Sequence, residues 1–332
     1  RSPNFRPLYR TIVRDALHLA WKEKRLWPFA LLAGFIQLGG IYDTLLLRLR
    51  SFGENAKELA DPTIPQLLGQ LQGQFFLNKV FAIQGLTLFA VIMIAVCLFS
   101  VIAQGTLILG LDAHGSKPKK SLKELLRHSA HHLIPLLAIN MVGVGAIWII
   151  GFLTTVPLLE TLSHPSIANV FAYLSLFALL VGATVIFTSW HMLALNALLV
   201  DELTFTEAFG HAWRIMKHSW LTILETAILL IVTSLAIYLV VLLGGILMNT
   251  PAMLLLMASV LLVMPKLYLF LRLLIAASIL ILLALAGLYT ITFQYATWNR
   301  LYERINEGTA HAKFHRFIHW VNGHLTTSKS RS

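Results

Sequence analysis

The polar residues with the clearest chemical potential lie inside long apolar runs of this sequence. His191 and Asn196 fall near the end of the run 167–200, and Glu225 falls about one turn into the run 221–248. Ionisable and amide side chains inside hydrocarbon are costly, so they mark candidate functional sites. We expect an intramembrane polar cluster of His191, Asn196 and Glu225. A purely local role for Glu225, at the interface or with a threonine of its own helix, is the alternative.

Charged residues are also expected at the opposite, outer ends of these runs. Asp43 lies in the first run, close to Arg48, and Lys266 and Arg272 flank the start of the last run. Long basic side chains at the end of a span can extend their charged heads to the interface, and Asp43 with Arg48 would form an ion pair there. Alternatively, Asp43, Lys266 and Arg272 line an outer vestibule over the segment 252–264.

The amides and glycines of the apolar runs have a simpler interpretation. Glutamine and asparagine side chains in spans commonly form hydrogen bonds between helices, and small residues allow helices to pack closely. We therefore expect hydrogen bonds between helices, or close helix packing, at Gln37, Gln84, Gln104, Asn140, Gly143, Gly145, Gly244 and Gly245.

Histidine and cysteine usage gives little support for a metal site. His311, His315 and His319 share one helix face, and two histidines at this spacing can bind a transition metal. Residues 308–332 contain no acidic residue or cysteine to complete such a site. A solvated face that gains charge as the pH falls through about 6.5 is the simpler interpretation. Cys97 is the single cysteine, which excludes an intramolecular disulfide, and we predict neither a metal nor another cofactor.

Common catalytic signatures are absent from the sequence. It has no glycine-rich phosphate loop, HExxH, CxxC or GxSxG. The segment 48–79 carries only three acidic residues, so we see no exposed carboxylate pair suited to hydrolysis. The sequence therefore predicts a protein that is not an enzyme, with an intramembrane enzyme as a distant alternative.

Membrane spans are the elements that would hold these side chains. Of the 332 residues, 57% are hydrophobic and 12% are charged, whereas soluble domains are about 25% charged. The mean hydropathy of +0.75 agrees with a chain that mostly faces lipid. A span needs about 20 apolar residues, and the runs that satisfy this are 26–47, 80–111, 133–159, 167–200, 221–248 and a broken stretch 252–298.

The distribution of basic residues sets the number of spans. Lysine and arginine concentrate in cytoplasmic segments; residues 1–25 carry seven of them, 112–132 carry five and 298–332 carry six. Six spans place all three segments on one side, whereas seven would place the basic tail outside. We predict six spans in a bacterial cytoplasmic membrane, with both termini in the cytoplasm. The segment 252–264 is then re-entrant or interfacial, after an outer connection at 249–251.

An amphipathic segment precedes each pair of spans. The segments 8–21, 121–133 and 204–220 all carry apolar residues at helical spacing, and Ser121-x-x-Glu124 and Thr204-x-x-Glu207 have the spacing of a capping box. We predict an all-α bundle of three repeats, each an amphipathic helix followed by a two-span hairpin. The expected boundaries are repeats at 8–111, 121–200 and 204–298 within one transmembrane domain 1–298, an amphipathic helix at 299–325 and a disordered tail at 326–332.

The net charge of +11 also favours a membrane partner. Because the basic residues lie between apolar runs, topology and anionic lipid headgroups explain them better than nucleic acid does. Tryptophan beside basic residues at the end of an amphipathic helix suits the headgroup layer. We expect this interface to contain Trp21, Lys22, Trp213, Arg214, Lys217 and Trp220.

The segments 191–202, 204–220 and 296–304 carry a family resemblance. They resemble a diffuse group of bacterial six-span proteins, which includes the membrane domain attached to glycerophosphodiester phosphodiesterases. The enzymes of that group carry a separate soluble barrel with acidic and histidine metal ligands, for which this chain has no room outside its apolar runs. The resemblance therefore implies the architecture and no catalytic residue. The proline usual at the exit of the fourth span is absent here, where Asn196 and Ala197 stand.

Two functions follow from these patterns. The first is a non-enzymatic protein of envelope or lipid homeostasis that binds inner-leaflet headgroups, and a membrane-protein partner or a second copy of the chain. The alternative is a transporter or lipid-translocating protein with a polar path near the inner ends of spans four and five. A transporter would have a water-filled cavity at the polar cluster, whereas an interaction protein would be a closed bundle there.

Overall fold

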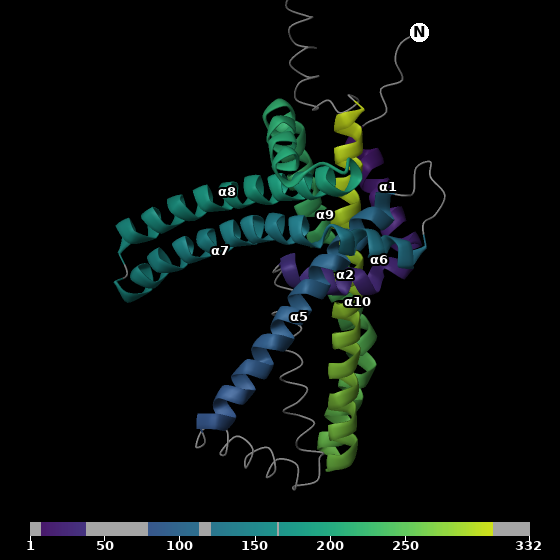
Figure 1. The fold of residues 1–332 in the computed structure, drawn as a ribbon. Helices are drawn as coiled ribbons and strands as arrows, with labels where there is room; N and C mark the ends of the chain where they lie inside the picture. The colour runs from purple at the N-terminus through teal and green to yellow at the C-terminus, as the bar shows by residue number, and fades with distance from the viewer. Residues whose placement is uncertain (1–7, 38–78, 113–120, 165, 308–332) are drawn as a thin grey trace, which may run out of the picture. The chain divides into compact units, whose positions relative to one another are not determined.

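The structure, a computed structural model, describes residues 8–37, 79–112, 121–164 and 166–307, and the regular secondary structure in these ranges is all helical. In chain order these are α1 (Leu8–Lys22), the 3-10 helix η1 (Lys24–Leu26), α2 (Trp27–Gln37), α5 (Lys79–Asp112), α6 (Leu122–His131), α7 (Leu133–Ser163), α8 (Ile167–Val200), α9 (Phe205–Leu261) and α10 (Pro265–Asn306) (Figure 1). Helices satisfy their own backbone hydrogen bonds, as spanning segments must in lipid.

Five helices in these ranges, α5, α7, α8, α9 and α10, are long and apolar enough to cross a membrane. The protein is thus a polytopic α-helical membrane protein. α8 has the predicted bounds of the fourth run, and α5 and α7 contain the second and third. The first run, 26–47, is described only as far as Gln37, so the count of six spans stays a prediction.

Several predictions fall outside the described residues. They concern Asp43, the segment 48–79 except its last residue, the histidines at 311, 315 and 319, and the tail beyond residue 307.

The last described helix, α10, is longer than one span, because it continues through residue 298 to Asn306. The predicted boundary at 298 therefore falls inside a helix.

The predicted connection at 249–251 is wrong, and so is the re-entrant segment 252–264, because α9 runs through Pro251 to Leu261. Proline is tolerated in a membrane helix when nearby polar side chains satisfy the local carbonyls. Asn249 Nδ2 donates to Gly245 O and Thr250 Oγ1 donates to Ile246 O, both at 2.8 Å. Both bonds lie in the turns that precede the proline ring, where they add side-chain donors to the helix.

The turn between α9 and α10 lies at residues 262–264 instead. Val263 has a left-handed backbone, with φ of 54°. Its N–H donates to Val260 O at 3.1 Å, and the N–H of Met264 donates to Ser259 O at 2.9 Å. This pair of bonds is a Schellman cap, and Pro265 then begins α10 at the position where proline is favoured.

The described residues gather into two compact units, and the first comprises residues 1–29, 101–233 and 292–332. Its core is built from small and apolar side chains of many helices. Ala16 and Ala20 of α1 and Ala208 and Ala212 of α9 are fully buried, and residues 191–199 of α8 are buried without interruption. Small side chains let helices approach closely, which places the amphipathic helices against this core.

The helix breaks of the first unit separate amphipathic segments from apolar ones. α1 ends before η1, α6 ends at His132 before α7, and α9 is kinked at Ser219, where φ is −118° and ψ is 25°. The predicted capping box of α6 is present: the N–H of Ser121 donates to Glu124 Oε2 at 2.9 Å, and the N–H of Glu124 donates to Ser121 Oγ at 3.3 Å. The start of α9 has one half of this arrangement, in which Thr204 donates to Glu207.

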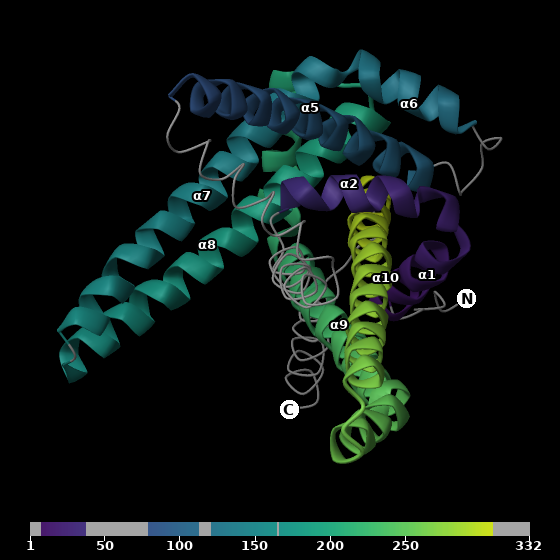
Figure 2. The same ribbon diagram turned by 90° about the horizontal axis from the view of Figure 1, so that it is seen from below.

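α7 and α8 form an antiparallel hairpin within the first unit (Figure 2). Its turn is held by polar side chains: Ser166 Oγ accepts from the N–H of Asn169 at 3.1 Å, and Asn169 Nδ2 donates to His164 O at 2.9 Å. Large apolar side chains near this turn, such as Ile167 at 80% exposure, cover the outside of the hairpin. That surface suits lipid rather than water.

The second unit comprises residues 30–100 and 234–291. Within it, Ser278 Oγ of α10 donates to Asn249 Oδ1 of α9 at 2.6 Å, which joins the two helices. Its large apolar side chains are mostly exposed, for example Leu247 at 74%. An exposed apolar surface of this extent is expected of helices surrounded by lipid.

The cap at Val263 makes a testable prediction about the turn. A β-branched residue in the left-handed region is strained by about 1 kcal/mol or more, so Val263→Gly should raise the free energy of unfolding in detergent by about 1 kcal/mol. Val260→Gly, one turn earlier inside α9, is the matched control and should lower it by about 1 kcal/mol. Equal destabilisation by both substitutions would contradict a left-handed cap at residue 263.

Candidate functional site

Four polar side chains of the first unit form a continuous hydrogen-bonded chain. Asn140 of α7 is its centre: Nδ2 donates to Gln104 Oε1 of α5 at 2.6 Å, and Oδ1 lies 3.2 Å from His191 Nε2 of α8. Gln104 Nε2 donates in turn to Tyr295 Oη of α10 at 2.9 Å. All four residues are at most 4% exposed. The chain therefore ties four helices together in the interior.

The bonds of Asn140 determine how His191 is protonated. Its Nδ2 also donates to Leu136 O at 2.9 Å, so both amide hydrogens are used. Oδ1 must then accept, and the histidine Nε2 must carry the hydrogen that it donates. An imidazole held in one tautomer by an amide is well suited to fixing helix positions.

The His191 ring lies directly against the backbone of α7. A Cβ atom added to Gly143 would be 2.4 Å from Cδ2 and 2.6 Å from Cγ of the ring. Only glycine leaves room for the imidazole here, so the predicted close packing is confirmed at Gly143. It is wrong at Gly145 and Gly244, which have open space beside them.

The predicted cluster is only partly reproduced by these contacts. His191 and Asn196 are both buried, but their described hydrogen bonds go to different partners. Asn196 Nδ2 donates to Met192 O of its own helix at 2.8 Å, and its Oδ1 is buried without a partner in the described part of the chain. Glu225 is half-buried on α9, and its contact with the other two stays a prediction.

The sequence predicts interhelical hydrogen bonds for Gln104 and Asn140, but it does not predict that they connect to His191. The predicted bonds between helices are confirmed for Gln104 and Asn140, whereas Gln84 is exposed and the Gln37 side chain lies outside the described residues. Tyr295 was missed, because a tyrosine in an apolar run gives no polar signal. The sequence clue was that Gln104 lies near the end of the run 80–111 and Asn140 near the start of the next run, 133–159. Consecutive spans place these two ends at the same side of the membrane.

All six residues predicted for the headgroup interface are exposed. Trp21, Trp213 and Trp220 are 58%, 46% and 58% exposed, and Lys22, Arg214 and Lys217 are exposed as well. Basic groups lie over two of these rings: Lys24 Nζ is 4.3 Å from the centroid of Trp21, and Lys217 Nζ is 5.4 Å from that of Trp213. These distances are within the range of a cation–π contact. α1 and the start of α9 thus each present an aromatic and basic face.

The predicted outer vestibule is described only in part. Lys266 is exposed in the first turn of α10, and Arg272 is half-buried and has an interaction partner. Asp43 lies outside the described residues, so the vestibule stays a prediction.

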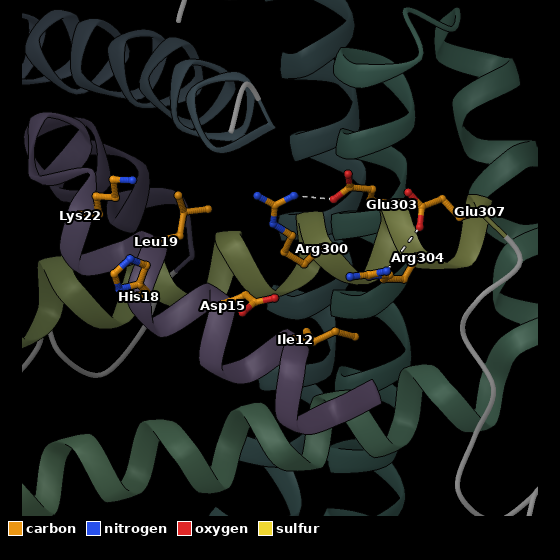
Figure 3. Close-up of a pocket in the computed structure, with 9 residues that line it drawn as sticks. All are labelled: Ile12, Asp15, His18, Leu19, Lys22, Arg300, Glu303, Arg304 and Glu307. Carbon is orange, nitrogen blue, oxygen red and sulfur yellow. Dashed lines mark hydrogen bonds and ion pairs between the residues drawn. The ribbon is translucent and has the colours of Figure 1, made fainter. Parts of the chain in front are cut away.

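A polar pocket of about 360 Å³ lies between α1 and the end of α10 (Figure 3). Sequence reasoning missed it, because its two walls are far apart in the chain. Seven of its nine lining residues are ionisable or histidine. The lining consists of Ile12, Asp15, His18, Leu19 and Lys22 from α1 and Arg300, Glu303, Arg304 and Glu307 from α10 and the residue after it.

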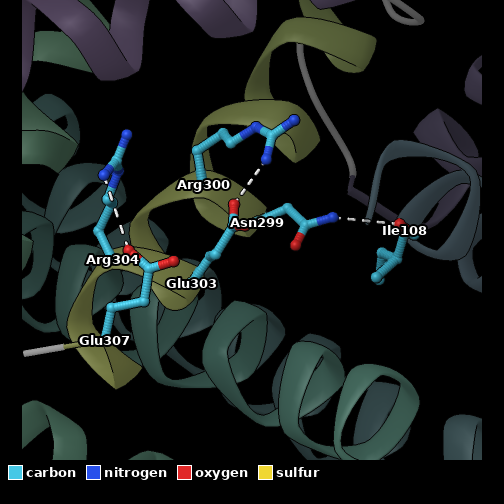
Figure 4. Close-up of polar contacts among 6 residues, drawn as sticks. All are labelled: Ile108, Asn299, Arg300, Glu303, Arg304 and Glu307. Atoms are coloured by element: carbon cyan, nitrogen blue, oxygen red, sulfur yellow. Dashed lines mark hydrogen bonds and ion pairs between the residues drawn. The ribbon is translucent and has the colours of Figure 1, made fainter. Parts of the chain in front are cut away.

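Ion pairs lie within the end of α10 beside this pocket, and hydrogen bonds join this end to α5 and α8. Arg300 Nη1 is 2.6 Å from Glu303 Oε2, and Arg304 Nη1 is 3.6 Å from Glu307 Oε2. Asn299 points away from both pairs, and its Nδ2 donates to Ile108 O of α5 at 3.2 Å (Figure 4). Tyr302 makes one further contact: its hydroxyl donates to Asp201 at the end of α8.

Neither a metal centre nor a known relative assigns a function. The described part of the chain contains no group of three or more histidine, cysteine, aspartate or glutamate residues that could hold a metal ion. No protein-family model, no curated protein and no solved structure matches the sequence. The resemblance to the membrane domain of glycerophosphodiester phosphodiesterases therefore stays a prediction.

The contact between Gly143 and His191 can be tested with two alanine substitutions. Gly143→Ala would place a methyl group 2.4 Å from Cδ2 and 2.6 Å from Cγ of the imidazole. We therefore expect a loss of about 1–3 kcal/mol in the free energy of unfolding. Gly145→Ala, in open space on the same helix, should instead stabilise the protein by up to about 1 kcal/mol. Unfolding of both variants in detergent measures the difference, and similar values for the two would contradict the close approach.

Proposed function

We propose that this chain is a non-enzymatic protein of the bacterial cytoplasmic membrane that binds anionic headgroups of the inner leaflet and acts in envelope or lipid homeostasis. The observation that carries this proposal is the pair of two-sided helices, α1 and the start of α9. Each buries alanines on one face and exposes tryptophan and basic side chains on the other. Such a face suits the headgroup layer, where rings lie at the interface and cations meet phosphates.

The placement of basic residues supports one orientation for the whole first unit. Lysine and arginine favour the cytoplasmic side, and this unit contains α1, α6, the start of α9 and the end of α10. We infer that these elements share the inner leaflet, with both termini in the cytoplasm. The expected arrangement is three repeats of an amphipathic helix and a two-span hairpin. The breaks at η1, His132 and Ser219 support such repeats.

Packing around the polar chain favours interaction over transport. A transport path needs space for water or substrate, whereas the His191 ring fills the space above Gly143 and is 4% exposed. Three of the four members of the chain are neutral amides or a phenol, which join helices well and carry no charge to move. We therefore keep interaction as the proposed role, with a membrane protein or a second copy as a further partner class.

The orientation can be tested by cysteine labelling in intact bacterial cells. In a Cys97→Ala background, His164→Cys in the α7–α8 turn should react with a membrane-impermeant maleimide. Glu307→Cys, just after α10, should react only after the cells are permeabilised. Labelling of Glu307→Cys in intact cells would contradict the cytoplasmic C-terminus, the six spans and the inner-leaflet placement together.

Lipid preference can be tested by tryptophan quenching in proteoliposomes. Brominated phosphatidylglycerol should quench the protein more than brominated phosphatidylcholine with the same acyl chains. Each basic residue near an anionic surface contributes about 1 kcal/mol, so the double variant Arg214→Gln/Lys217→Gln should lose most of the difference.

The matched control for quenching is Lys266→Gln, which removes an exposed basic residue at the start of α10. It should leave the preference for the anionic lipid unchanged. Equal quenching by both lipids in the unaltered protein would overturn the proposed function.

A further inference from the structure

We propose that the pocket between α1 and the end of α10 binds a zwitterionic phosphoethanolamine group, with its phosphate beside Lys22 and Arg300 and its ammonium beside Asp15. The inference deepens the proposed function and rests on it, because the pocket must lie at headgroup level to meet a lipid. The same chemical group can come from phosphatidylethanolamine or from its soluble glycerol-linked headgroup, and the experiment below separates these sources.

The charges that line the pocket favour a zwitterion over an anion. Lys22, Arg300 and Arg304 are basic, and Asp15, Glu303 and Glu307 are acidic, so the lining is balanced when His18 is neutral. A ligand with only negative charge would meet three carboxylates at close range. A ligand with both charges can place each one against its opposite.

The charged groups of α1, and the N–H groups of Arg300 that do not contact Glu303, are available to a ligand. On α10, Arg300 and Arg304 already pair with Glu303 and Glu307. In contrast, Lys22 and His18 have no hydrogen-bond or ion-pair partner in the described ranges, and Asp15 has only a contact of 4.0 Å with the exposed Arg14. A bound zwitterion would supply the partners that Asp15 and Lys22 lack.

Helix geometry brings these groups to one side of the ligand. Asp15, His18 and Lys22 are spaced i, i+3 and i+7, so they share one face of α1. Figure 3 shows α1 crossing α10, and these three residues line the pocket together with the charged residues of α10. His18 lies about one turn from both Asp15 and Lys22. Its imidazole can therefore donate to a phosphate held beside Lys22.

The size and the position of the pocket fit a lipid headgroup. Its volume of about 360 Å³ lies at the low end of the range for small-ligand sites, about 300–1,000 Å³. The buried side chains of Ile12 and Leu19 give it an apolar wall that suits a glycerol backbone. Trp21, which directly precedes Lys22, is exposed and is one of the residues that we place at the interface.

The test is native mass spectrometry of the full chain in detergent, titrated with phosphatidylethanolamine, phosphatidylglycerol, glycerophosphoethanolamine and inorganic phosphate. We expect preferential binding of phosphatidylethanolamine. Lys22→Gln should weaken this binding roughly tenfold, because it removes one charge-assisted contact. Asp15→Asn should weaken it by a similar factor and leave phosphatidylglycerol binding unchanged or stronger. Lys266→Gln removes an exposed basic residue that neither lines the pocket nor belongs to the headgroup interface, and should have no effect.

Several outcomes decide the proposal. Binding of glycerophosphoethanolamine with the same sensitivity to Asp15→Asn supports the pocket and shows that a free headgroup suffices. Equal binding of phosphatidylglycerol, or an Asp15→Asn variant that binds like the unaltered protein, overturns it. Binding of inorganic phosphate alone also overturns it, since no ammonium would then be recognised. Because Asp15→Asn is compared on two lipids in one protein, general unfolding would weaken both and is thereby recognised.

Failure of the pocket proposal can be distinguished from failure of the proposed function. The quenching experiment changes Arg214 and Lys217, neither of which lines the pocket. If the anionic preference in quenching remains and phosphatidylethanolamine is not bound, the pocket assignment alone falls. If quenching shows no anionic preference, the proposed function falls whatever the pocket binds.

Discussion

The hydrogen bonds of Asn140 are the constraint on which the interior of the first unit depends. This one side chain donates to Gln104 and to Leu136 O and accepts from His191, so α5, α7 and α8 cannot shift independently. In a water-free interior an unpaired amide costs about 1–3 kcal/mol, and therefore each helix is held at the position that completes the set. Tyr295 extends the same constraint to α10. The glycine at 143 is a consequence, because the imidazole can reach the amide only by passing close to the α7 backbone.

The same interior determines what the surface of the first unit presents. α10 passes from Tyr295 through Asn299 to Tyr302, and each of these residues bonds to another helix: α5, α5 and the end of α8 respectively. This stretch fixes the rotation of α10, and with it the side on which Arg300 and Arg304 line the pocket with α1. The pocket is therefore a product of the core packing, since its α10 wall has no freedom to rotate away.

Sequence reasoning predicted the elements better than the contacts between them. Span-length apolar runs are strong signals, so α5, α7 and α8 were found close to their bounds. The predicted connection at 249–251 is wrong because α9 continues through Pro251. The turn comes about ten residues later, where a valine makes the left-handed cap that glycine usually makes. The pairing of His191 with Asn140, and the meeting of residues 12–22 with residues 300–307, depend on tertiary packing that no local pattern encodes.

The exposed faces and the pocket use charge in two physically different ways. Arg214 and Lys217 are solvated cations, and such charges act over distances comparable with the Debye length of about 8 Å in physiological salt. Under the proposed function they would therefore respond to the average charge of a leaflet and distinguish headgroups poorly. In the pocket, opposite charges stand within a few ångströms, as the 2.6 Å pair of Arg300 and Glu303 illustrates, and their long-range fields cancel. What remains is short-range and directional, so it can respond to the arrangement of charges within one headgroup. Under the two proposals above, a protein with both features in one unit would first be held by a charged surface and then select a single lipid from it.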